Sequence, residues 1–328
     1  MRATLFIVLF AVPLFAAGPE PPPRDTLPAQ IDLEHVPNGF SARPTAPADN
    51  PLTPAKVRLG RRLFFDPVLS GDRSVACASC HQPDHGFAGS AALPVGVRGQ
   101  KGKRNAPSLL NVGYSIFFFW DGRAKSLEEQ ALLPIADPTE MDSTPEEAVR
   151  RLRAEPSYVE QFQTAFDGEV TTGNLAKAIA SFERTLLSGD SLVDRFRGGE
   201  VAGLSAEARQ GLWLFESRGG CWRCHADHNL SDGKFHNTGV GRGADLGRYG
   251  ITHQDRDRGA FKTPTLRNVA RTGPYMHDGS MATLEEVVRY YSRGGDPNPN
   301  LDPLVKPLNL SDDDVRNLVA FLEALTGK

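Results

Sequence analysis

The chain has 328 residues, and its 37 Lys and Arg against 40 Asp and Glu give a formal net charge of −3. This slight acidity excludes a mainly electrostatic partnership with nucleic acid. Once an N-terminal leader is set aside, the length is sufficient for two domains of ordinary size.

Residues 1–18 have the pattern of a secretory signal peptide. Arg2 precedes an apolar run from about Leu5 to Ala17, and small residues follow. Because the run is short for a bilayer span, we predict a cleaved signal and export to the periplasm. An uncleaved membrane anchor is the alternative. A proline-rich stretch, 19–54, predicts an extended leader, and no later stretch predicts a membrane span in the mature chain.

All four cysteines lie in two copies of one pentapeptide, CxxCH. The copies are Cys77, Cys80 and His81, then Cys221, Cys224 and His225. The pattern is typical of covalent haem c attachment, in which each thiol bonds to a vinyl group and the histidine ligates the iron. Zinc sites and redox dithiols also use CxxC, but neither needs the histidine that follows. The sequence therefore predicts two haem c groups.

An internal repeat relates the two halves of the chain. Segments 106–131 and 263–288 share nine identical positions at a constant offset of 157, Asn111 and Gly122 among them. The CxxCH motifs are offset by 144, so the second copy holds about thirteen extra residues, within a glycine-rich region, 234–261, whose role the sequence does not give. We expect two haem domains of common ancestry, 55–199 and 200–328.

The secondary structure around these segments is predicted to be helical. Ser126 and Thr283 each stand three positions before a glutamate, which is the capping-box pattern, and Thr144 and Ser311 are further N-cap candidates. Apolar residues recur on one face of two segments: Leu175, Ile179, Phe182 and Leu186, then Val315, Leu318, Phe321, Leu322 and Leu325. No alternating strand pattern appears. The predicted fold is all-α, with two tandem cytochrome c-like domains.

The group opposite each histidine decides the function. A haem with two strong axial ligands transfers electrons, whereas an open position binds peroxide or dioxygen. Met141 lies 60 residues after His81, so a dihaem electron carrier is one hypothesis. The repeat suggests another, because Tyr291, on a helical stripe with Leu284, is equivalent to Pro134, and only tyrosine can ligate iron. That asymmetry predicts an open first haem and a closed second one, unless Tyr291 is an ordinary core residue.

Longer blocks resemble the bacterial dihaem cytochrome c peroxidase superfamily. They are "RLFFDPVLSGDRSVACASCH", "KRNAPSLLNV", "FWDGRAKSLEEQALLPIADPTEM", "FKTPTLRNVARTGPYMHDG" and "LVAFLEALTG", which together span the chain after the leader. The resemblance implies an oxidoreductase that reduces hydrogen peroxide to water at its first haem. It also implies a second haem that receives electrons from a small periplasmic donor, a cytochrome c or a cupredoxin.

The resemblance implies roles for individual residues. Trp120 matches a tryptophan between the haems, and Glu140 matches a distal carboxylate that takes a proton from peroxide and returns it to the leaving oxygen. Gln130 and Pro134 match further distal positions, and His277 matches a histidine near the second haem. Asn105, Thr272 and Pro274 match residues that hold a calcium ion between the domains. Met141, beside the distal carboxylate, is thereby reassigned to packing.

Two departures from the peroxidase pattern indicate the MauG-type branch, which oxidises tryptophan or tyrosine side chains of a partner protein. Val97 stands where typical members carry a histidine that caps the first iron, and Tyr291 replaces a methionine ligand. The branch's surface tryptophan is absent, since Gly219 stands there, although Trp222 could substitute. A peroxidase, a protein-modifying enzyme and an electron carrier therefore remain open, and so does the partner. His85, His228 and His253 are expected to be surface or loop residues.

Overall fold

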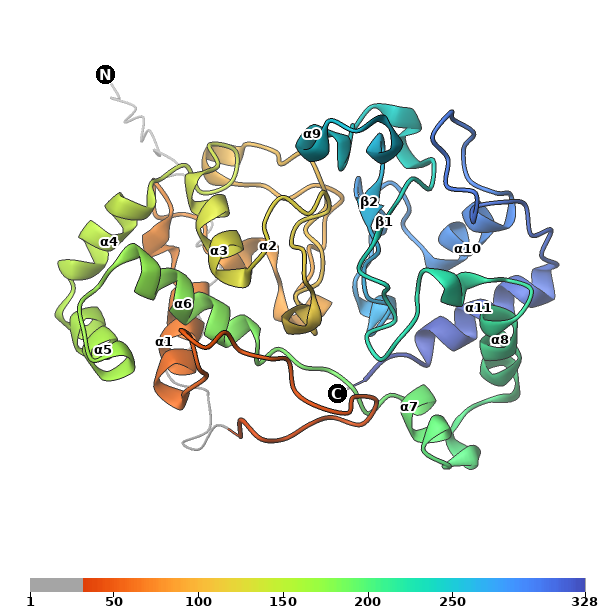
Figure 1. Cartoon of the computed structure of the whole chain (residues 1–328), viewed down its shortest axis with the longest axis horizontal. Coiled ribbons are helices and arrows are strands. Elements are labelled where there is room, and N and C mark those ends of the chain that lie inside the picture. Colours follow the sequence, from red (N-terminus) through yellow and green to blue (C-terminus); the bar gives the residue numbers. More distant parts are fainter. Residues whose placement is uncertain (1–31, 328) are drawn as a thin grey trace, which may run out of the picture.

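The computed structural model describes residues 32–327, so the predicted signal peptide, 1–18, lies outside the described residues. Two helical lobes lie side by side along the long axis of the molecule (Figure 1). The helices are α1 Pro54–Phe65, α2 Cys77–Cys80, α3 Leu127–Ala136, α4 Pro145–Arg153, α5 Pro156–Phe166, α6 Thr172–Glu183, α7 Leu192–Arg197, α8 Ala206–Glu216, α9 Tyr249–Thr252, α10 Leu284–Ser292 and α11 Asp312–Glu323. The all-α prediction is confirmed.

One small element was not predicted. Strands β1 (Phe235–His236) and β2 (Phe261–Lys262) form an antiparallel pair. They lie at the two ends of the glycine-rich region. Two residues are too few to show the alternation by which a strand is recognised in sequence. Within the described part of the chain, no helix is long and apolar enough to cross a membrane.

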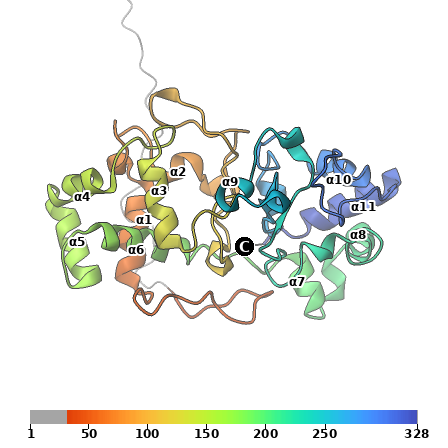
Figure 2. The same ribbon diagram turned by 45° about the horizontal axis from the view of Figure 1, so that its top comes forward.

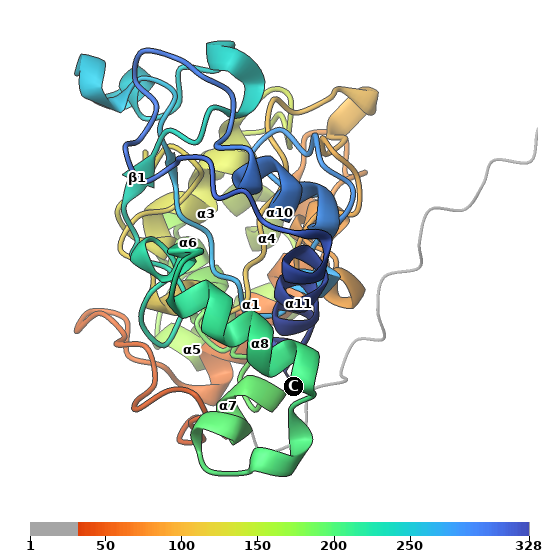
Figure 3. The ribbon, with the colours of Figure 1, turned by 90° about the vertical axis from the view of Figure 1, so that its right-hand side faces the viewer.

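Each lobe is built around one close helix crossing. In the N-terminal lobe α1 crosses α6, and a Cβ added to Gly60 would overlap the carbonyl oxygen of Ala178. In the C-terminal lobe α8 crosses α11, where a Cβ on Gly211 would overlap the carbonyl oxygen of Asn317 (Figure 3). The missing side chain lets the backbones approach closely, and apolar residues then fill the core on either side. The duplication therefore preserves the packing as well as the sequence.

The predicted helix starts are found with their capping side chains in place. Thr283 accepts from the backbone N–H of Glu286, whose carboxylate accepts from the N–H of Thr283, so this capping box is complete. Ser311 forms the same kind of box at α11. At α3, Ser126 caps as expected, but the Glu129 carboxylate accepts from the N–H of residue 125 rather than of Ser126. Each cap satisfies backbone donors that no intrahelical carbonyl can reach.

The sequence prediction was wrong at the ends of the two apolar stripes. Helix α6 ends at Glu183 and α11 at Glu323, so Leu186 and Leu325 lie beyond them. Both leucines are still buried, and their carbonyl oxygens accept the backbone N–H of Asn111 and Asn268, respectively. These asparagines are equivalent in the repeat and share a left-handed φ of 59° and 58°. The carbonyls of Leu186 and Leu325 thus bond to the repeated segments and not to a further turn of their own helices.

The part of the leader that the structure describes runs along both lobes (Figure 2). The Phe40 ring stacks on Tyr114 of the N-terminal lobe with centroids 4.5 Å apart. The carbonyl of neighbouring Gly39 accepts from Arg267 of the C-terminal lobe at 3.2 Å. This segment therefore bridges the two lobes on the side away from β1 and β2.

Candidate functional site

A single cavity of about 1120 Å³ extends between the lobes and contains almost all the residues that the sequence singles out. Small-molecule sites usually measure about 300–1,000 Å³, so this cavity is large enough for a bulky group. The predicted residues that line it are Cys80, His81, Asn105, Trp120, Gln130, Pro134, Glu140, Cys221, Cys224, His225, Thr272, Pro274, His277 and Tyr291. Cys77 opens the same helical turn as Cys80 but packs against the core cluster that holds Phe64.

The histidines of the two CxxCH motifs are held in the same way. His81 Nδ1 lies 3.1 Å from the carbonyl oxygen of Phe87, and His225 Nδ1 lies 3.0 Å from that of Leu230. A carbonyl can only accept, so Nδ1 carries the proton and Nε2 remains free to ligate a metal. Burial lowers the pKa of both rings, which favours the neutral form that iron requires. The two motifs thus present equivalent nitrogens to one cavity.

Neighbouring tyrosines on α10 have different surroundings. Tyr290 is 2% exposed, and its hydroxyl donates to the carbonyl of Thr238 at 2.9 Å and accepts from the N–H of Asp296. Tyr291 instead lines the cavity together with Leu284 and His225, and burial raises the pKa of its hydroxyl. Tyr290 is therefore an ordinary core tyrosine, held by two backbone partners. Tyr291 faces the cavity beside the second CxxCH motif.

Glu140 lies on the part of the cavity wall that the N-terminal lobe supplies. Its carbonyl accepts from the N–H of Val97 at 2.9 Å, and its N–H donates to the carbonyl of Asp137 at 3.1 Å. A Cβ added to Gly96 would overlap the Glu140 backbone, so glycine is needed for this close approach. Burial, with the Asp137 carboxylate, raises the pKa of Glu140. Val97 itself is fully buried outside the cavity lining, so it offers no group there.

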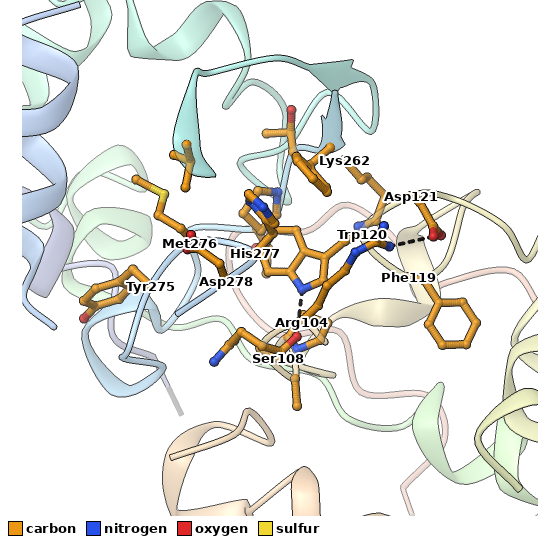
Figure 4. Close-up of a pocket in the computed structure, with 18 of the residues that line it drawn as sticks. Arg104, Ser108, Phe119, Trp120, Asp121, Lys262, Tyr275, Met276, His277 and Asp278 are labelled. Carbon is orange, nitrogen blue, oxygen red and sulfur yellow. Dashed lines mark hydrogen bonds and ion pairs between the residues drawn. The ribbon is translucent and has the colours of Figure 1, made fainter. Parts of the chain in front are cut away.

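The lobes exchange equivalent hydrogen bonds at their boundary. The N–H of Asn105 donates to the carbonyl of His277 at 2.7 Å, and the N–H of Lys262 donates to the carbonyl of Trp120 at 2.8 Å. Asn105 is equivalent to Lys262, and Trp120 to His277, at the offset of 157, so the second bond repeats the first and the lobes meet about an approximate two-fold axis. The Trp120 indole N–H also donates to the Asn105 carbonyl at 2.8 Å (Figure 4). Trp120 is thereby fixed at the boundary, where its ring lies 6.5 Å from that of His277.

The other residues considered from sequence have simpler surroundings. Met141 is 3% exposed inside the N-terminal core and does not line the cavity, which agrees with its reassignment to packing. A Cβ on Gly219 would lie 2.6 Å from the carbonyl oxygen of Leu214, so a larger residue there would need backbone movement. Trp222 is 45% exposed. His228 and His253 are exposed, as expected.

Several cavity residues were missed from sequence. His236 of β1 lies between two carboxylates, with Nδ1 2.6 Å from Asp302 and Nε2 2.9 Å from Asp232. Hydrogen bonding to Cys224 and these carboxylates raises its pKa to about 10 against the effect of burial. Although Cys224, Asp232 and His236 could hold a metal ion as a group, the CxxCH pattern already commits Cys224 to haem. Arg104 and Lys262 also line the cavity. His236 lies in the glycine-rich region outside the aligned repeat, and neither it nor Lys262 belongs to a motif, so no sequence pattern marked them.

The residues present fit two haem c groups. Each CxxCH turn presents a histidine Nε2 to the cavity, and three of the four thiols line it. The thiols form no disulfide and are therefore available for thioether bonds. The lining combines aromatic side chains with cations, which suits a flat apolar macrocycle that carries carboxylates.

A family profile and several known proteins are similar to this chain. The family profile described as "Di-haem cytochrome c peroxidase" matches residues 54–202. The methylamine utilization protein MauG of Methylorubrum extorquens is 43% identical over 283 residues, which cover 85% of this chain and 80% of that protein. The cytochrome c551 peroxidase of Pseudomonas aeruginosa is 36% identical over 289 residues, covering 85% and 80%.

Two solved structures are similar over almost the whole chain. The crystal structure of a MauG-like protein associated with microbial copper homeostasis superposes with a TM-score of 0.82 at 35% identity, covering 89% of this chain and 95% of that one. The diheme peroxidase BthA from Burkholderia thailandensis superposes with a TM-score of 0.76 at 26% identity, covering 85% and 87%.

Proposed function

Because the chain belongs to the di-haem cytochrome c peroxidase and MauG family of oxidoreductases, we propose that it reduces hydrogen peroxide at a first haem and shares the oxidising equivalents with a second. Cys77, Cys80 and His81 would hold the first haem, and Cys221, Cys224 and His225 the second. The observation that carries the proposal is the single cavity in which His81, Glu140, Trp120 and His225 meet.

Bound at His81, haem would supply a redox-active iron with a coordination position open to peroxide. The buried Val97 places no ligand at that position. Glu140 is suited to take a proton from peroxide and return it to the departing oxygen, because its raised pKa lies closer to neutral pH than that of an exposed glutamate. Gln130 and Pro134, which line the same wall, would shape the space for peroxide.

The second haem site is proposed to store and pass on oxidising equivalents. Tyr291 and His225 would both hold its iron, since both line the cavity and Tyr291 lacks the backbone partners that hold Tyr290. An anionic oxygen ligand would favour the oxidised iron. Trp120, fixed between the lobes, would carry the electron between the two sites. Asn105, Thr272 and Pro274 would hold calcium at this boundary through side-chain and backbone oxygens.

Electrons for peroxide reduction are proposed to come from a small periplasmic redox protein, a cytochrome c or a cupredoxin. Export fits haem c attachment, and the signal peptide pattern of 1–18 supports it. A second candidate function is oxidation of tryptophan or tyrosine side chains in a partner protein. It is favoured by Tyr291 in the cavity and by the exposed Trp222 inside the second CxxCH motif. Steady peroxide turnover with reduced cytochrome c distinguishes the two.

The experiment measures peroxide consumption and cytochrome c oxidation by the holoprotein and two variants. E140Q removes the proposed base, whereas E146Q makes the same change at an exposed glutamate of α4. Loss of a general base lowers turnover by about 10²–10⁴-fold, so we expect that loss in E140Q and normal rates in E146Q. Equal rates in all three proteins would refute the role of Glu140. No donor-dependent turnover in the wild type would leave the protein-modifying function.

A further inference from the structure

Lys262 is a cation in the cavity wall without an anionic partner among the described residues. It is half-buried in β2, and burial lowers the pKa of its ammonium group to about 8. No carboxylate of the described part of the chain forms an ion pair with it. Burying a cation without an anion costs several kcal/mol, so such a group usually faces a ligand that supplies the negative charge.

The other half-buried cations of the wall are already paired. Arg104 donates to Asp121 and to Asp245, in each case at 2.6 Å (Figure 4 shows the first). Arg123 pairs with Asp121 at 3.2 Å and lies over an aromatic ring. The charge of Lys262 therefore remains unbalanced while those of its neighbours are satisfied.

The repeat places a neutral residue at the equivalent position of the N-terminal lobe. Lys262 is equivalent to Asn105, whose amide donates to the carbonyls of Ala91 and Ala92 at 3.2 and 3.3 Å. The same place in the N-terminal lobe thus holds a neutral side chain with protein partners. Both residues make the same backbone bond across the boundary, so the ammonium group is a feature of one lobe only.

The position of Lys262 connects it to the electron path. Its N–H donates to the carbonyl of Trp120, and the preceding Phe261 stacks on His277 with ring centroids 3.6 Å apart. Figure 4 shows Lys262 in one group with Trp120 and His277. A group bound to this ammonium would lie at the boundary that both haem sites share.

We propose that Lys262 binds a propionate carboxylate of one of the two haems at the lobe boundary. The inference rests on the proposed function, which places two haems in this cavity. Each haem carries two propionates, whose charge matches the unpaired ammonium. A fixed positive charge beside a haem favours its reduced state by Coulomb attraction, so Lys262 would raise the reduction potential of the haem it holds relative to the other. Lys262 acts as a positioning residue that tunes the transfer through Trp120.

The test is a spectroelectrochemical titration of the diheme holoprotein, in which the two haems are resolved by their absorption spectra. K262Q removes the charge, K262R keeps it, and K234Q makes the same charge change at an exposed lysine beside β1. We expect K262Q to lower the potential of one haem more than the other and more than K234Q does. K262R should stay near the wild type. If K262Q does not accumulate, K262M serves in its place because it retains the apolar stem.

Potentials in K262Q that change no more than those in K234Q would overturn the proposal, as would equal shifts of both haems. Peroxide turnover of the wild type is measured in parallel. Turnover with unchanged potentials in K262Q would refute the role of Lys262 and leave the proposed function standing. Absence of turnover in the wild type, with two haems attached, would refute the proposed function while the potentials still report on Lys262.

Discussion

Replacement of Arg267 by glutamine should strongly destabilise the protein. The guanidinium forms two hydrogen bonds with the Asp194 carboxylate, at 2.8 and 3.0 Å, and the two side chains are only 4% and 6% exposed. It also donates to the carbonyls of His228 and Gly39, and its centre lies 4.3 Å from the Phe40 ring centroid. One side chain thus joins α7, the C-terminal lobe and the leader.

The magnitude follows from the burial of this pair. Removal of one partner leaves the other charge buried, which costs about 3–5 kcal/mol. A domain of 150–250 residues loses roughly 2–4 °C of unfolding temperature per kcal/mol, so R267Q should unfold roughly 10 °C below the wild type. Burial would raise the pKa of Asp194, but hydrogen bonds from Arg267 and Ser191 outweigh it and hold the pKa below its usual value. The pair therefore stabilises the protein above about pH 4. Below that pH Asp194 becomes protonated, so the difference in unfolding temperature between R267Q and the wild type should become smaller.

Thermal unfolding of the holoproteins, followed by far-UV circular dichroism, measures the effect. R316Q is the matched control, because Arg316 pairs with Asp313 on the surface of α11 with side chains 68% and 78% exposed. Surface pairs contribute about 0–1 kcal/mol, so R316Q should unfold close to the wild type. An R267Q variant as stable as R316Q at pH 7 would show that the buried pair does not hold the lobes and leader together.

Three further outcomes are expected. D137N removes a negative charge that raises the pKa of Glu140, so the acid limb of the pH profile of kcat/KM for peroxide should move to lower pH; an unchanged profile counts against Glu140 as the base. G279A places a Cβ against the Ala92 backbone at a φ of 64° and should lower the unfolding temperature, whereas G250A in α9 has open space and should not; equal effects would contradict this. Chelation of calcium should reduce peroxide turnover and added Ca²⁺ restore it, and turnover indifferent to chelators argues against the calcium site.

Local signals predicted much of the fold. N-cap residues such as Thr283 and Ser311 act within one helical turn, so sequence alone was enough to place the helix starts. The helix ends at Glu183 and Glu323 were missed because Leu186 and Leu325, just beyond them, accept hydrogen bonds from residues that are distant in sequence, Asn111 and Asn268. Contacts of that kind are decided by the assembled lobes and not by helix periodicity.

The candidate site was predictable where a motif or the repeat marked a residue. The CxxCH histidines and the pairing of Tyr291 with Pro134 come from such patterns, and all of these residues line the cavity. His236 and Lys262 were missed, since each belongs to a two-residue strand that has no signature in sequence. Both are notable for the charges around them. His236 lies between two carboxylates, and Lys262 has no anionic partner among the described residues. Only the assembled cavity shows these surroundings.

The central claim is that the first haem is open to peroxide and the second is closed by Tyr291. The most direct measurement is an electron paramagnetic resonance spectrum of the resting diferric protein, before and after one equivalent of peroxide. A high-spin signal beside a low-spin one, both lost on addition of peroxide, is the predicted result. Two low-spin signals that do not respond to peroxide would mean that a ligand closes the first iron, and the protein would then be an electron carrier.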